Sequence, residues 1–89
     1  MSHSFEDTNG FLPGLRLLFV EDEALVYMHH VEILERIGCV VTGCTDLADA
    51  LELVECQDFD VALLDINIKG AMSYGLAEVL LQRGIPVAS

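Results

Sequence analysis

Basic residues are scarce in this sequence: the 89 residues include four Lys and Arg against fifteen Asp and Glu, giving a formal net charge of −11. Nucleic acids and anionic lipid surfaces are bound through basic surfaces. We therefore expect neither nucleic acid nor a membrane as a direct partner. The negative charge favours a bound cation or a basic protein, or it only keeps a small domain in solution.

Long apolar runs and paired cysteines are also missing. No segment approaches the roughly 20 apolar residues that span a bilayer, and from the first residues we expect no secretory signal. Cys39, Cys44 and Cys56 are an odd set without a C-x-x-C pair, which argues against a disulfide framework or a zinc site. Their pattern is typical of small buried side chains in a reducing compartment, so we expect a cytoplasmic protein.

What the chain does contain is typical of one small globular domain. Hydrophobic residues make up 53% of the sequence and charged residues 21%, a composition that differs from that of disordered chains. Residues 1–14 are a polar N-terminal leader that ends in a Pro-Gly turn signal. The sequence therefore predicts a leader over 1–14 and a folded domain over 15–89.

Short apolar runs predict the strands. Three of them lie at 15–20, 39–43 and 61–64, and a fourth strand is expected to start at 86–88. The first run is nearly continuous and stops at an acidic triplet, as in a strand that is buried on both faces. The spacing of the four runs leaves room for a helix between each pair.

Apolar residues at helical spacing predict those helices, at 24–37, from 47 to 54, and around Leu76–Leu80. Gly38 and Gly84 are expected to end the first and third helices. Asp46 is expected to cap the second helix through the amide of Asp49. The buried side of the first helix is predicted to contain Ala24, Val26, Tyr27, Val31, Ile33, Leu34 and Ile37.

Strands that alternate with helices at this spacing form right-handed βαβ units and hence an α/β fold with a doubly wound parallel sheet. In such sheets ligands bind at the carboxyl ends of the strands, between strands one and three in the flavodoxin-like order. Glu21 and Asp22 follow the first strand, and Asp65 follows the third. We therefore expect three carboxylates in one crevice.

Clustered carboxylates repel one another unless a cation joins them. Mg²⁺ is held in proteins by one or two carboxylates, waters and phosphate oxygens. It would also neutralise the charge of an incoming phosphoryl group, and an aspartate can act as the nucleophile for such a group. The residues thus predict a magnesium site that supports phosphoryl transfer.

Two segments carry a family resemblance. The run Leu17–Glu23, together with Asp58–Asn67, resembles the receiver domain of two-component response regulators. The resemblance extends from Leu15 to the end of the chain. It implies that Asp65 is the phosphoacceptor. It also implies that Mg²⁺ is bound directly by Asp22 and Asp65, through water by Glu21, and by the backbone carbonyl of Asn67.

The resemblance has further implications. The fold would be flavodoxin-like, also called CheY-like, with strand order 2-1-3-4, and 15–89 would be the N-terminal two-thirds of a receiver. The phosphoryl donor would be a sensor histidine kinase or a phosphotransfer protein, with a downstream target that sequence does not identify. The chain would not be an enzyme beyond Mg²⁺-dependent self-phosphorylation from small donors and autodephosphorylation. The family's switch Ser or Thr and its Lys would fall beyond Ser89.

Other interpretations compete with a phosphorylated receiver. A degenerate receiver would act only as a phosphorylation-independent interaction module. A nucleotide-binding Rossmann unit needs a Gly-rich first turn. In this chain the corresponding turn, residues 21–24, contains no glycine. A haloacid-dehalogenase-type phosphatase needs an acid where Asn67 stands. Because an exposed fourth strand would leave an unpaired apolar edge, we also expect a homodimer or an exchange of elements between two copies.

Overall fold

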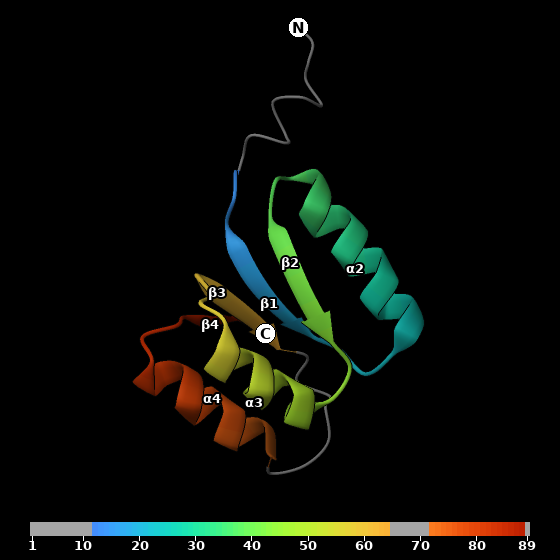
Figure 1. Ribbon diagram of the computed structural model, residues 1–89. Helices are drawn as coiled ribbons and strands as arrows, with labels where there is room; N and C mark the ends of the chain where they lie inside the picture. Colours follow the sequence, from blue (N-terminus) through green and yellow to red (C-terminus); the bar gives the residue numbers. More distant parts are fainter. Residues whose placement is uncertain (1–11, 65–71, 89) are drawn as a thin grey trace, which may run out of the picture.

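The computed structural model describes residues 12–64 and 72–88, and these form alternating strands and helices (Figure 1). In chain order the elements are β1 (Arg16–Val20), α2 (Ala24–Arg36), β2 (Val40–Cys44), α3 (Leu47–Cys56), β3 (Val61–Leu64), α4 (Met72–Gln82) and β4 (Val87–Ala88). Within that part of the chain, no helix has the length and apolar character needed to cross a membrane.

The four strands form one parallel sheet in the order β2-β1-β3-β4, which confirms the predicted topology. The prediction for β2 was one residue early, because the strand runs from Val40 to Cys44 instead of 39–43. Cys39 belongs to the turn that closes α2: its N–H donates to the carbonyl of Leu34 at 3.1 Å. This hydrogen bond keeps Cys39 out of the sheet ladder.

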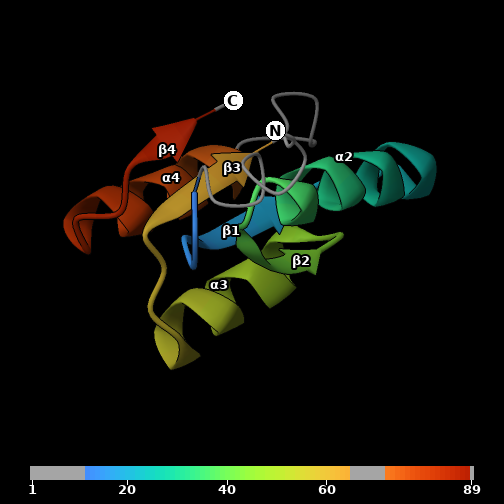
Figure 2. The same ribbon diagram turned by 90° about the horizontal axis from the view of Figure 1, so that it is seen from above.

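Helices α3 and α4 pack together on one face of the sheet, and α2 lies against the other face (Figures 1 and 2). The larger core lies under α3 and α4, where the side chains of both helices meet alternate residues of β1 and β3. Its completely buried members are Leu18, Val20, Ala50, Val54, Ala62, Leu76 and Leu80. Burial of these side chains is the main stabilising contribution to the fold.

The core under α2 is smaller. Leu17, Phe19 and Cys39 are buried there, but no residue of α2 is fully buried. The prediction that Ala24 and Ile33 face the core was wrong, because Ala24 is exposed and 43% of the Ile33 surface is exposed. Each helical residue turns by about 100°, so Ile33 lies well to one side of the stripe formed by Val31 and Leu34.

The ends of the helices follow the sequence signals. After α4, Gly84 has a φ of 74°, its N–H donates to Leu81, and the N–H of Ile85 donates to Leu80. Gly38 closes α2 in the same way, so both predicted glycine stops are confirmed. The predicted cap of α3 is also confirmed: Asp46 Oδ1 accepts from the N–H of Asp49 at 2.8 Å.

The cysteines are free thiols in three different environments. Cys39 is buried, and burial raises the pKa of the half-buried Cys44 to about 11. The expectation that all three are buried was wrong for Cys56, which is exposed. It is the last residue of α3 and lies two positions beyond Val54, so it points away from the buried stripe of that helix.

Candidate functional site

The pairing of β1 with β3 sets the position of the candidate site. In this parallel pair Val20 is the register partner of Leu64, so both strands end at the same level of the sheet. The chain continues from Val20 into Glu21 and Asp22, and from Leu64 into Asp65. The strand order places this pair at the topological switch point, where doubly wound sheets bind ligands.

Two of the four predicted site residues lie within the described residues. Glu21 and Asp22 follow β1 directly at its carboxyl end, as the sequence predicted. Asp65 and Asn67 lie outside the described residues, so their position relative to Glu21 stays a prediction. Among 12–64 and 72–88 there is no group of three or more His, Cys, Asp or Glu residues that could hold a metal ion.

Glu21 is the one buried charged residue of the described part, with 5% of its surface exposed. Its backbone N–H donates to the carbonyl of Cys44 at 3.1 Å, which continues the β1–β2 ladder by one residue. Its Oε2 accepts a hydrogen bond from the N–H of Glu23 at 3.1 Å. These bonds hold the Glu21 carboxylate at the start of α2.

Asp22 differs from its neighbour because its side chain is exposed. Residue 23 then caps α2 in an extended conformation, with φ −98° and ψ 117°, and makes no side-chain capping bond. Glu21 and Asp22 thus present one carboxylate in the interior and one toward solvent. Two oxygen ligands of this kind fit Mg²⁺, which prefers carboxylates and keeps several of its waters.

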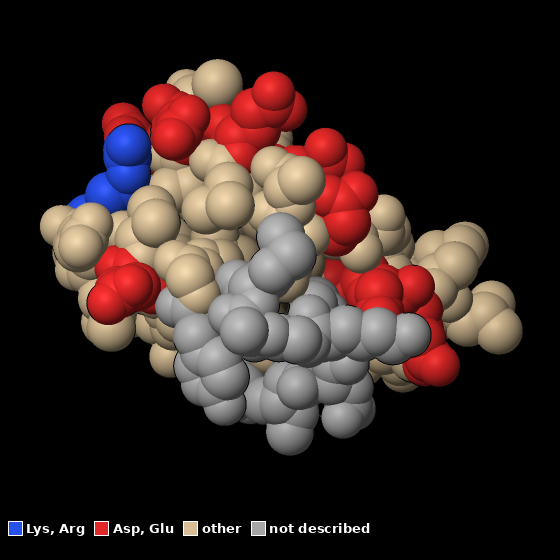
Figure 3. All heavy atoms as spheres, turned by 90° about the horizontal axis from the view of Figure 1, so that it is seen from below, with Lys and Arg blue, Asp and Glu red and all other residues tan. Residues whose placement is uncertain are grey.

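The charge around this end of the sheet is negative. Figure 3 views the molecule from the carboxyl ends of the strands and shows Asp and Glu side chains on several sides. Among the described residues, Lys or Arg side chains are visible in that view at one edge only. Such a field attracts cations and favours a basic partner over an acidic one.

Sequence reasoning missed that Glu21 would be buried, because the change from apolar to acidic residues after Val20 resembles an ordinary strand end.

A contact of Tyr27 was also missed, because this residue was expected only to pack. The Tyr27 ring stacks on Phe19 with centroids 5.7 Å apart, and its hydroxyl lies over Gly43. The glycine in a β-rich run was the available signal, since it marks a close approach.

His30 of α2 makes contacts with its own helix and with β1. Its Nδ1 lies 2.9 Å from the carbonyl oxygen of Val26, within the same helix. Its ring centroid lies 5.8 Å from that of Phe19. The residue is nevertheless exposed overall, because it lies at the side of the stripe that faces the sheet.

The fold and the residues that follow β1 define a class of signalling domain. The family described as the response regulator receiver domain matches residues 17–87, so the chain belongs to this family. It is a receiver domain of the kind used in two-component signal transduction. The predicted family and the flavodoxin-like fold are thereby confirmed.

Two particular relatives support this assignment. An uncharacterized transcriptional regulatory protein, YbdJ of Bacillus subtilis (strain 168), is 33% identical over 78 residues, which cover 85% of this chain and 34% of YbdJ. The solution structure of the BeF3-activated conformation of SdrG from Pseudomonas melonis Fr1 matches with a TM-score of 0.69 and 36% identity. That match covers 84% of this chain and 65% of SdrG. The chain thus spans about a third of the length of YbdJ and slightly under two-thirds of the length of the SdrG chain.

Proposed function

We propose that this receiver domain accepts a phosphoryl group on Asp65, with Mg²⁺ bound beside it. The proposed metal ligands are Asp22 and Asp65 directly, Glu21 through water, and Asn67 through its backbone carbonyl. The observation that supports this best is the register of β1 with β3, in which Val20 and Leu64 are partners. Family membership supports the same roles.

The transfer itself requires little covalent help. A carboxylate oxygen of Asp65 attacks phosphorus in the phosphohistidine of a sensor kinase or a phosphotransfer protein. A new P–O bond forms, the P–N bond breaks, and the electron pair returns to the imidazole, which takes up a proton from solvent. With acetyl phosphate as the donor, a P–O bond breaks and acetate leaves. Mg²⁺ bound there would neutralise phosphoryl oxygens, since this reaction depends mainly on positioning and electrostatics.

Asp22 and Glu21 lie in different environments, which suit different roles in binding the metal ion. Asp22 is exposed and can meet a hydrated cation directly. Glu21 is buried, and one of its oxygens already accepts from the N–H of Glu23, which suits a ligand that acts through water. The proposed compartment is the cytoplasm, in agreement with three free thiols.

A Mg²⁺ titration followed by NMR tests the metal site. Asp22→Asn should weaken Mg²⁺ binding by about tenfold or more, because it removes one of the few charged ligands of a weak site. Glu52→Gln is the matched control, since Glu52 is exposed on α3. Equal affinities for the two variants would contradict the proposed site.

Incubation with radiolabelled acetyl phosphate tests the transfer. Label should enter the chain only with Mg²⁺ present and should be stable to acid but lost in alkali, as expected of an acyl phosphate. Asp58→Asn, which changes an exposed carboxylate at the other end of β3, should label like the wild type. If the chain takes up no label from acetyl phosphate or from phosphorylated histidine donors, the phosphorylation-independent module would replace this proposal.

A further inference from the structure

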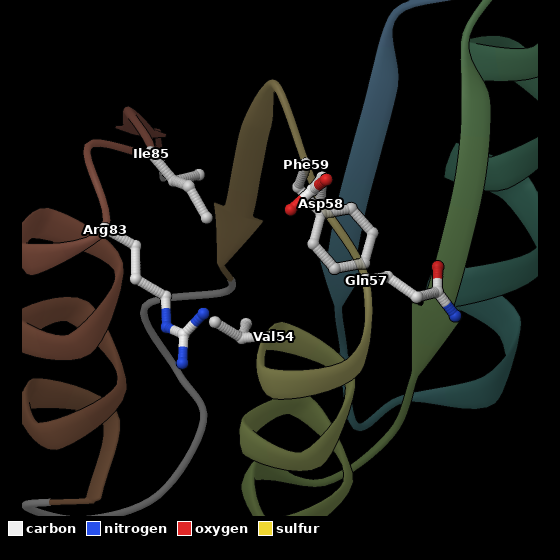
Figure 4. A pocket seen from close by; sticks show the side chains of 6 residues that line it. All are labelled: Val54, Gln57, Asp58, Phe59, Arg83 and Ile85. Atoms are coloured by element: carbon white, nitrogen blue, oxygen red, sulfur yellow. The ribbon is translucent and has the colours of Figure 1, made fainter.

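A pocket of about 230 Å³ lies at the amino ends of β3 and β4 (Figure 4). The segments that line it are the end of α3, the loop before β3 and the loop before β4. Its lining residues are Val54, Gln57, Asp58, Phe59, Arg83 and Ile85. This is the opposite end of the sheet from Glu21 and Asp22, so the pocket is separate from the proposed phosphorylation site.

The floor of the pocket is apolar and belongs to the main core. Val54, Phe59 and Ile85 are all buried. Ile85 is held by the turn that ends α4, where its N–H donates to the carbonyl of Leu80 at 2.8 Å. Because core side chains keep fixed positions, this floor exists before any ligand arrives.

The rim carries two opposite charges. Arg83 directly follows α4, and in Figure 4 its guanidinium extends across the pocket toward Val54. Among residues 12–64 and 72–88, the ion pairs involve Arg16 and Arg36, and Arg83 takes part in none. Asp58 lies beside Phe59 on the other side of the pocket. An Arg guanidinium with five donors is well suited to a carboxylate.

We propose that this pocket binds a small carboxylate with an apolar body about the size of one aromatic ring. The apolar body would lie on Val54, Phe59 and Ile85, and the carboxylate would pair with Arg83. Typical ligand pockets measure about 300–1,000 Å³, so 230 Å³ limits the ligand to this size. A purely polar anion such as phosphate would leave the apolar floor in contact with water.

NMR titration of the 89-residue chain with benzoate tests the proposal. Benzoate should cause saturable shifts at 54, 57–59 and 83–85, with a dissociation constant on the order of 1 mM, as expected for a ligand of few atoms. Arg83→Gln should weaken binding about fivefold or more. Arg36→Gln is the matched control, because Arg36 lies at the end of α2, away from the pocket, and should leave the affinity unchanged.

Two further measurements separate charge recognition from apolar contact alone. Benzamide has the same ring without the charge and should bind several-fold more weakly than benzoate. Asp58→Asn removes a negative charge from the rim and should tighten benzoate binding. Absence of saturable shifts, equal affinity of Arg83→Gln and wild type, or equal affinity for benzamide and benzoate would overturn the proposal. Mg²⁺ binding by Arg83→Gln should remain normal, because the two sites lie at opposite ends of the sheet.

Discussion

Arg16 and Asp60 form a two-pronged ion pair between the start of β1 and the residue before β3. Arg16 Nη2 lies 2.9 Å from Asp60 Oδ1, and Nε donates to Oδ2 at 3.1 Å. The backbone N–H of Arg16 donates to the same carboxylate at 2.8 Å. These residues are 44 positions apart in the chain, so the pair forms only when β1 and β3 meet in their native register.

This pair predicts a dependence of stability on pH. Hydrogen bonds from the Arg16 side chain and backbone lower the pKa of Asp60 from 3.8 to about 2. Because the folded-state pKa is the lower one, the stabilisation is present above the unfolded-state value and is lost as the pH falls from about 4 to 2. Solvent and salt moderate the effect, since both side chains are partly exposed.

Thermal unfolding of Asp60→Asn should therefore show a lower midpoint than the wild type at pH 6, with the difference shrinking toward pH 2. Asp58→Asn is the control, because Asp58 makes no ion pair among the described residues. A difference between Asp60→Asn and wild type that stays constant over this pH range would contradict the role of the ionised Asp60.

The contact of Tyr27 with Gly43 predicts opposite effects for two glycine substitutions. A Cβ at Gly43 would collide with the Tyr27 ring, so Gly43→Ala should cost about 1–3 kcal/mol of unfolding free energy through overpacking. At Gly75, inside α4, an added Cβ meets nothing within 4 Å. Gly75→Ala should stabilise the protein by about 0.5–1 kcal/mol. Urea unfolding measures both, and stabilisation by Gly43→Ala would show that Tyr27 lies elsewhere.

The turn after α4 gives a third prediction. Gly84 has a φ of 74°, in the left-handed region that costs other residues roughly 1–2 kcal/mol. Gly84→Ala should lower the free energy of unfolding by about that amount, although the added Cβ would have open space around it. Gly84→Asn should cost less, because Asn adopts this conformation more readily. Equal stability of Gly84→Ala and wild type would show that the turn has another geometry.

The β4 edge predicts self-association. Val87 is 37% exposed and Ala88 is also exposed on this two-residue strand, so the edge offers apolar side chains and backbone groups to a second copy. We expect a homodimer, formed by paired β4 edges or by exchanged elements, and Val87→Lys should shift it toward monomer. Val40→Lys on β2 is the matched control, because Val40 is 56% exposed at the opposite edge. Light scattering that finds a wild-type monomer at tens of micromolar would remove this prediction.

Local signals in the sequence predicted much of the fold. The glycines at 38 and 84, the Asp46 cap and the apolar runs each act within a few residues, so their effects can be deduced without coordinates. The position of Glu21 and Asp22 followed from the same reasoning, because strand ends and their order are encoded by these runs.

Other features depend on distant partners and were not predicted. The Arg16–Asp60 pair joins segments that only the folded sheet brings together. The pocket near Arg83 is lined by the end of α3 and by two separate loops. No local pattern in either loop indicates it, since its shape arises from packing between α3 and α4.

The central claim is that Asp65 carries the phosphoryl group, and locating the modification in the chain tests it most directly. After reaction with acetyl phosphate and Mg²⁺, borohydride reduction should convert the phosphorylated aspartate to homoserine, which mass spectrometry of peptides can place. We predict homoserine at residue 65 alone, with none formed in Asp65→Asn. Homoserine at Asp22, Asp60 or another acid, or an unchanged yield in Asp65→Asn, would contradict the account.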